Sequence, residues 1–249
     1  SGCRALCALC STGRAGQDQA RECGGLRAVV AAMGRFLGHS DVQVQCCAAL
    51  GAMTAGNRES QTVAGGIEGG VEAVVRAMGA HAAEAEVQMA GCAALRQLCE
   101  GNADNGVIAG VKGAVAALVE AANHNIGSAA IIAEALHTLR EVVEVNPYNG
   151  AAFSENGGVD TVIAAMKLYG SNLQVLSDGC HVLAFSAFDG PAHAPISSGS
   201  SSSSSNSTSS SGGSSGEDKE DSDSRDNEGG ISELAEGDET EEEEEEEEN

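Results

Sequence analysis

The sequence has 249 residues, enough for one or two ordinary domains, with 13 Lys and Arg against 37 Asp and Glu and a net charge of −24. Residues 1–196 hold 11 basic and 18 acidic side chains, and residues 197–249 hold 2 and 19. Because phosphate binding requires clustered Lys and Arg, nucleic-acid binding is not expected. Gly and charged residues interrupt every apolar run, so no transmembrane segment is predicted.

A period of 44 or 45 residues runs through the apolar part of the chain. One landmark is a leucine that recurs at Leu6, Leu50, Leu95, Leu139 and Leu183. A second is a glycine pair or its equivalent, whose second residue recurs at Gly25, Gly70, Ala114 and Gly158. Two landmarks with one period in the forties predict a helical repeat.

Each unit is predicted to hold a short, a medium and a long helix, in that order. Asn57, Asn102 and Asn146 are suited to cap short helices, and Pro147 fits a first helical position. After each glycine break, apolar residues at i, i+3, i+4 and i+7 predict the medium helix. The long helix follows a polar break with three candidate N-caps, Ser40, Ser128 and Ser171. It has small or apolar residues at i and Leu at i+3, as in Cys47/Leu50, Cys92/Leu95, Leu136/Leu139 and Cys180/Leu183.

This pattern divides the chain into seven segments. Residues 1–15 are expected to supply only the last helix of a unit. Four complete units are expected at 16–57, 58–102, 103–146 and 147–190. A Ser/Gly-rich linker at 191–216 and an acidic tail at 217–249 follow, both expected to be disordered because they have little apolar surface to bury.

The glycine-pair opening of the medium helix and the Cys-Ala-Ala-Leu motif of the long helix resemble the armadillo repeat. The resemblance covers residues 1 to about 190. It implies an all-α, right-handed armadillo-type α-solenoid (superhelix) whose third helices line a concave groove that holds an extended peptide. The importin-alpha family has Trp two residues before the third-helix Leu and Asn two residues after it. This pattern is missing here, because the chain has no Trp and no Asn two residues after any of the five leucines. The resemblance therefore does not support recognition of a basic nuclear-import signal by this segment.

The groove columns implied by the resemblance contain a mixed polar strip. We expect it to consist of Arg96, Gln97, His137, Arg140, Glu141, His181 and Phe185. Arg could hold a carboxylate in a bidentate pair, and Phe185 could anchor an apolar side chain. The alternative is that Arg96, Arg140 and Glu141 are solvated positions with no partner.

No catalytic residue, cofactor or metal site is predicted. Cys3, Cys7 and Cys10 have the CxxxCxxC spacing of some iron–sulfur enzymes, but this spacing is also one face of a helix, and Cys3 shares a column with Cys47, Cys92 and Cys180, where a small buried residue is expected. The six histidines are too scattered for a zinc set. Gly65 to Gly70 lack the Lys-Ser/Thr of a phosphate loop and are interpreted as a turn.

The nine cysteines do not form the dense pattern of a small secreted scaffold, which favours the cytoplasm or nucleus. The expected function is a non-catalytic scaffold or adaptor for a protein or an extended peptide. Two alternatives stay open: a transport adaptor or chaperone that captures basic proteins with the acidic tail, or the non-catalytic arm of a larger enzyme such as a ubiquitin ligase. The tail could also solubilise the repeats or shield Arg96 and Arg140.

Overall fold

The computed structural model describes residues 2–186, and every regular element within them is helical. This confirms the predicted all-α class. The expected linker and acidic tail, 191–216 and 217–249, lie outside the described residues.

A long-helix segment, α1 (Gly2–Cys10), is followed by four sets of three helices, which confirms the predicted order of short, medium and long. The first set is α2 (Arg14–Glu22), α3 (Gly25–Arg35) and α4 (Ser40–Thr54). The second is α5 (Arg58–Thr62), extended by the π-helical turn η1 (Val63–Ile67), then α6 (Gly70–Ala80) and α7 (Ala85–Cys99). The third is α8 (Ala103–Val111), α9 (Ala114–His124) and α10 (Ala129–Val143). The fourth is α11 (Pro147–Glu155), α12 (Gly158–Leu168) and α13 (Leu173–Ser186).

The predicted caps of the short helices are confirmed. The side chains of Asn57, Asn102 and Asn146 each accept a backbone N–H in the first turn of α5, α8 and α11, and Pro147 is the first residue of α11.

Of the three serines expected to cap long helices, only Ser128 does so, and it accepts the Ile131 N–H at 3.5 Å. Ser40 is already the first residue of α4, and His39 occupies the N-cap. Before α13, Asn172 replaces the expected Ser171, because its Oδ1 accepts the N–H groups of Gln174 and Val175.

The medium helices all begin after a glycine in the left-handed conformation. Gly24, Gly69, Gly113 and Gly157 have φ between 70° and 82°, a region that residues with a Cβ rarely adopt. The first two of these glycines are 45 residues apart, and the others 44. The interval with the additional residue contains η1, so the insertion is accommodated as a π-helical turn before Gly69.

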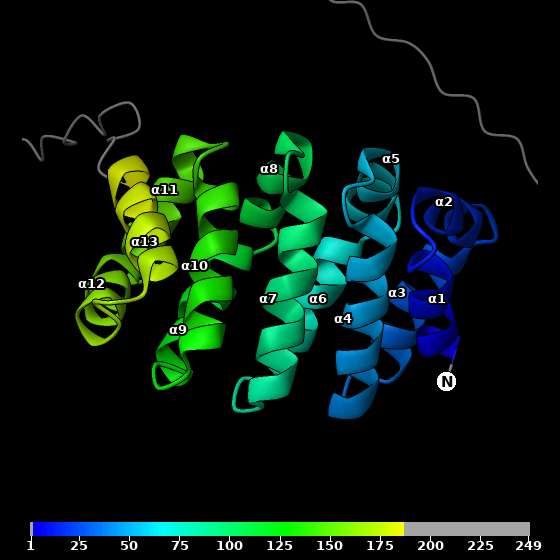
Figure 1. The fold of residues 1–249 in the computed structure, drawn as a ribbon, viewed down its shortest axis with the longest axis horizontal. Coiled ribbons are helices and arrows are strands. Elements are labelled where there is room, and N and C mark those ends of the chain that lie inside the picture. The colour runs from blue at the N-terminus through cyan, green and yellow to red at the C-terminus, as the bar shows by residue number, and fades with distance from the viewer. Residues whose placement is uncertain (1, 187–249) are drawn as a thin grey trace, which may run out of the picture. The chain divides into compact units, whose positions relative to one another are not determined.

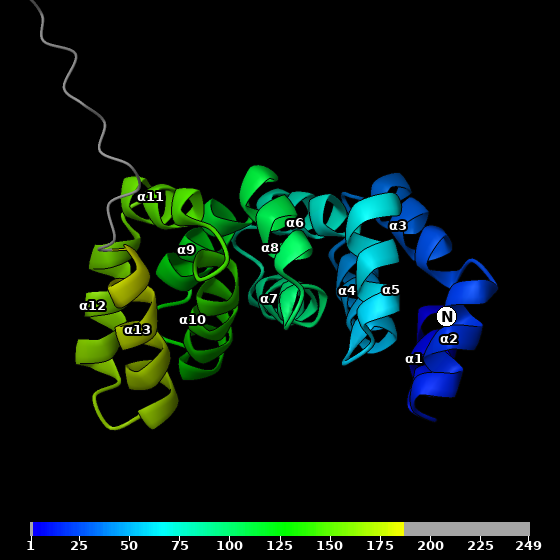
Figure 2. The ribbon, with the colours of Figure 1, turned by 90° about the horizontal axis from the view of Figure 1, so that it is seen from above.

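The core is built from the columns that define the repeat. Leu50, Leu95 and Leu139 are fully buried. Each long helix packs against the one before it and the one after it, so that α1, α4, α7, α10 and α13 lie side by side in chain order (Figure 1). Seen from above, α3, α6, α8 and α11 lie on one side of this row (Figure 2).

A column of buried amide side chains joins the short helices to the ends of the long ones. It consists of Gln17, Gln61, Asn105 and Asn149, spaced by 44 residues. Each side-chain nitrogen donates to two backbone carbonyls. Both glutamines bond to the end of the long helix that follows them, whereas both asparagines bond to the end of the preceding long helix and to the preceding short helix. The bonds to the long helices thus satisfy carbonyls that a helix end leaves unpaired.

Candidate functional site

The exposed side of the long helices contains all seven expected binding residues. The Leu column faces inward, so positions two residues before and after it are exposed or half-buried, as with Ala48 and Ala52 on α4 and His137 and Glu141 on α10. We call this surface the long-helix face. Its N-terminal half, on α4 and α7, is dominated by alanine, and its C-terminal half, on α10 and α13, by polar side chains.

Two adjoining hollows lie in the alanine half. The first, of about 310 Å³, lies between α4 and α7 and is lined by residues that include Ala48, Ala52, Ala93 and Gln97. The second, of about 420 Å³, extends to the start of α10 and includes Val44, Glu86, Met89 and Ile131 in its lining. Because both hollows share Ala90 and Ala93, we treat them as one feature, the alanine trough. Of the expected residues, only Gln97 lines it.

Arg96 binds two carboxylates of its own chain. Its Nε lies 2.6 Å from Glu134 Oε1 on α10, and its Nη1 lies 3.2 Å from Glu100 Oε2. When the side-chain amide of Gln97 is oriented with its oxygen toward Arg96, that oxygen accepts hydrogen bonds from both Arg96 Nη groups at 2.9 Å. The guanidinium that was expected to hold a ligand carboxylate is therefore engaged between α7 and α10.

Arg140 is held in the same way, one unit further on. Its Nη2 donates to Glu141 Oε1 at 2.7 Å, and its Nη1 lies 3.3 Å from Asp178 Oδ1 on α13. The hydrogen bond that Arg140 donates to Glu141, together with the charge of Asp178, raises the pKa of Arg140. The structure thus joins Arg140 and Glu141 to each other and to a carboxylate that is only 1% exposed.

Asp178 also contacts His137. The Nδ1 of His137 lies 3.2 Å from Asp178 Oδ2, and the Gln174 amide donates to the same oxygen. His181 and Phe185, both exposed on α13, complete the expected strip, with Phe185 37% exposed. His137, Arg140 and Glu141 therefore form one cluster, which is separate from the trough.

The sequence reasoning missed Glu134 and Asp178, the two acids that neutralise the arginines. A signal for them exists, because Arg96 and Glu134 are 38 residues apart and so are Arg140 and Asp178. In each pair the Arg follows the Leu of one long helix and the acid lies in the next long helix. A search for opposite charges at this fixed separation would have found both pairs.

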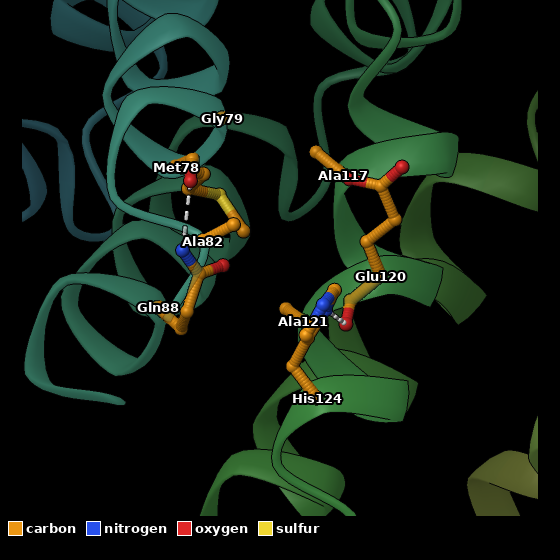
Figure 3. A pocket seen from close by; sticks show the side chains of 8 residues that line it. All are labelled: Met78, Gly79, Ala82, Gln88, Ala117, Glu120, Ala121 and His124. Carbon is orange, nitrogen blue, oxygen red and sulfur yellow. Dashed lines mark hydrogen bonds between the residues drawn. The ribbon is translucent and has the colours of Figure 1, made fainter. Parts of the chain in front are cut away.

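The cavity drawn in Figure 3 lies between α9 and the junction of α6 and α7. Its volume is about 10 Å³, roughly the room for one water molecule. Gln88 faces it but donates to the carbonyl of Met78 at 2.8 Å, a bond that closes the loop between α6 and α7. This cavity is too small for a ligand.

A metal site and a membrane span each have structural requirements that the described residues can be compared with. Within residues 2–186, no group of three or more His, Cys, Asp and Glu is arranged to hold a metal ion. In the same part of the chain, no single helix is long and apolar enough to span a membrane. Only α8 and α9 together reach that length, and they are bent by 76°.

The cysteines differ in how far they are buried. Burial raises the pKa of Cys46, Cys47 and Cys99 to about 12, and that of Cys92 also rises. Cys180, expected inside the core, is instead exposed, because no further long helix within residues 2–186 packs against α13. Cys3, from the same column, is half-buried with its Sγ 3.6 Å from that of Cys46.

We therefore expect Ellman's reagent at about pH 8 to modify Cys23 and Cys180 quickly in the folded protein, because both are exposed and only an accessible thiolate reacts. Cys46, Cys47, Cys92 and Cys99 should react only on unfolding, which the slow phase of the absorbance trace would report. The double variant Cys23→Ser/Cys180→Ser should lose the fast phase. A fast phase that survives in this variant and maps to Cys47 or Cys92 would contradict the described burial.

No protein-family model matches the sequence, and a search of curated proteins gives no match. Among solved structures, an engineered protein whose crystal structure was determined by the Northeast Structural Genomics Consortium is similar to this chain. The match has 18% sequence identity, covers 74% of this chain and 88% of the other, and has a TM-score of 0.47.

Proposed function

We propose that this protein is a non-catalytic scaffold or adaptor of the armadillo type, a right-handed α-solenoid that binds an extended peptide of a partner protein along the long-helix face. The period of 44 to 45 residues and the packing of each long helix against the next support this architecture. In such arrays each unit closes the core of its neighbour, and the repeated outer positions form an extended binding surface. A cytoplasmic or nuclear location fits the nine cysteines, all of them unpaired.

The observation that supports this function most directly is the alanine trough. Small side chains on neighbouring long helices leave about 310 Å³ and 420 Å³ of adjoining space on the long-helix face. These sizes lie within the range of roughly 300–1,000 Å³ that is usual for ligand pockets. An extended segment that crosses the long helices would place side chains in this space.

The test is to fill the trough without adding charge. The double variant Ala48→Leu/Ala93→Leu should lose the partner proteins that the wild-type full chain captures, as read by mass spectrometry. Ala31→Leu is the matched control, because Ala31 is exposed on the medium helix α3. Circular dichroism should give equal helical content for all three proteins. Equal capture by the trough variant and the wild type would contradict the proposal.

The acidic tail supports a second candidate function. With 19 acidic and 2 basic residues in 197–249, it could itself hold basic cargo. Deletion of 217–249 in the same capture experiment separates the two functions. Partners held by the tail should disappear on deletion and on raising the salt concentration, whereas those held by the long-helix face should persist.

A further inference from the structure

The charge of the long-helix face indicates what kind of peptide it accepts. The five long helices and their C-cap residues contain seven acidic side chains and only three arginines, a net of −4 with His neutral. Arg96 and Arg140 are already paired with carboxylates on the neighbouring long helix. An acidic peptide would therefore meet no free guanidinium on α7 or α10.

The trough itself is apolar but has an acidic edge. Glu86, at the start of α7, is exposed and lines the second hollow. No ion pair within residues 2–186 involves Glu86. Glu134, on α10, and Glu100, after the end of α7, are paired with Arg96 and line neither hollow. A cation beside the trough would thus have an unneutralised carboxylate within reach.

We infer that the alanine trough selects an extended peptide that presents a bulky apolar side chain next to Lys or Arg. This rests on the proposed function and specifies the partner chemistry of the same surface. The apolar side chain fills the space that Ala48, Ala90 and Ala93 leave open, and the basic neighbour lies at Glu86. The two contacts have different roles: the buried anchor supplies affinity, and the exposed charge supplies selection between peptides.

Both features are needed to define this ligand. A basic peptide without an anchor would leave the trough filled with water and would be held only by exposed charges, which are weak and screened by salt. An apolar peptide with acidic neighbours would place its carboxylates beside Glu86. The acidic tail of the same chain is disfavoured as an occupant for that reason.

A displayed library of random twelve-residue peptides, panned against the full chain, tests the inference. Clones that also bind Ala48→Leu/Ala93→Leu are removed by counter-selection, and the remaining pool is sequenced. We expect enrichment of Phe, Tyr, Trp or Leu adjacent to Lys or Arg. A synthetic peptide from this pool should bind Glu86→Gln about twofold to fivefold more weakly than wild type at low salt, with the difference lost at high salt.

Glu155→Gln is the matched control, because Glu155 is an exposed carboxylate on α11 that lines neither hollow. It should leave peptide affinity unchanged. Enriched peptides that depend on the trough but are acidic, or that lack an apolar anchor, would overturn the inference and leave the proposed function intact. A pool with no trough-dependent peptide would count against the proposed function as well.

Discussion

Replacing Asn105 with alanine is expected to lower the free energy of unfolding by about 2–4 kcal/mol. The Nδ2 of Asn105 donates to the carbonyls of Gln61 at 2.8 Å and Leu98 at 2.7 Å, and the residue is 1% exposed. Alanine removes both bonds, including the one to Leu98 in the last turn of α7, where a helix has no backbone donor of its own. Urea unfolding followed by circular dichroism measures the change as a shift of the midpoint.

Asn156→Ala is the matched control for this experiment. The Nδ2 of Asn156 donates to one carbonyl, that of Ala152, on the exposed end of α11. Water replaces such a bond readily, so we expect a loss below about 1 kcal/mol. If the two variants unfold at the same urea concentration, the amide column does not stabilise the repeats.

Gly110→Ala is expected to lower the free energy of unfolding by a similar amount, about 2–4 kcal/mol, for a steric reason. A Cβ on Gly110 would overlap the Oδ1 of Asn149, another member of the amide column. Asn149 would have to move and give up its bonds to the carbonyls of Gly106 and Val142. The loss should appear in the same unfolding measurement.

Gly34→Ala is expected to raise the free energy of unfolding, whereas Gly110→Ala lowers it. Gly34 is the penultimate residue of α3, as Gly110 is of α8, but a Cβ at Gly34 meets nothing within 4 Å. Alanine there reduces the entropy of the unfolded chain and favours the helix, so we expect a gain of up to about 1 kcal/mol. Destabilisation by both substitutions would show that helix position, and not contact with Asn149, determines the effect.

Periodicity was sufficient to predict the helices of this chain. The apolar spacing after each glycine break and the three Asn caps depend on residues within about two helical turns, so they can be recognised locally. The errors at Ser40 and Ser171 are displacements of one residue, and they arose because His39 and Asn172, adjacent to each serine, occupy the N-cap. The π-helical turn η1 was missed because an extra residue can be accommodated at several points in a unit.

The candidate site was predicted less completely. Of the expected strip, His181 and Phe185 are exposed and the other five residues are half-buried, as the helical period predicts for outward-facing positions. It treated Arg96 and Arg140 as free, because the residues that meet across neighbouring helices depend on how the units stack. The trough was missed because an alanine is inconspicuous in a sequence, and only the apposition of α4 and α7 converts several of them into a hollow.

The two ion pairs across the long helices also bear on whether the units are interchangeable. Arg96 needs the acid supplied by Glu134 in the next unit, and Arg140 needs Asp178 in the one after that. The corresponding position is Ala90 in α7 and Gln45 in α4, and neither has a charge. Ala90 would face an arginine if the second unit (α5 to α7) were duplicated in tandem or were placed directly after the third (α8 to α10). The charges thus favour the native order of these two units, and a designer who exchanges them must supply an acid in place of Ala90.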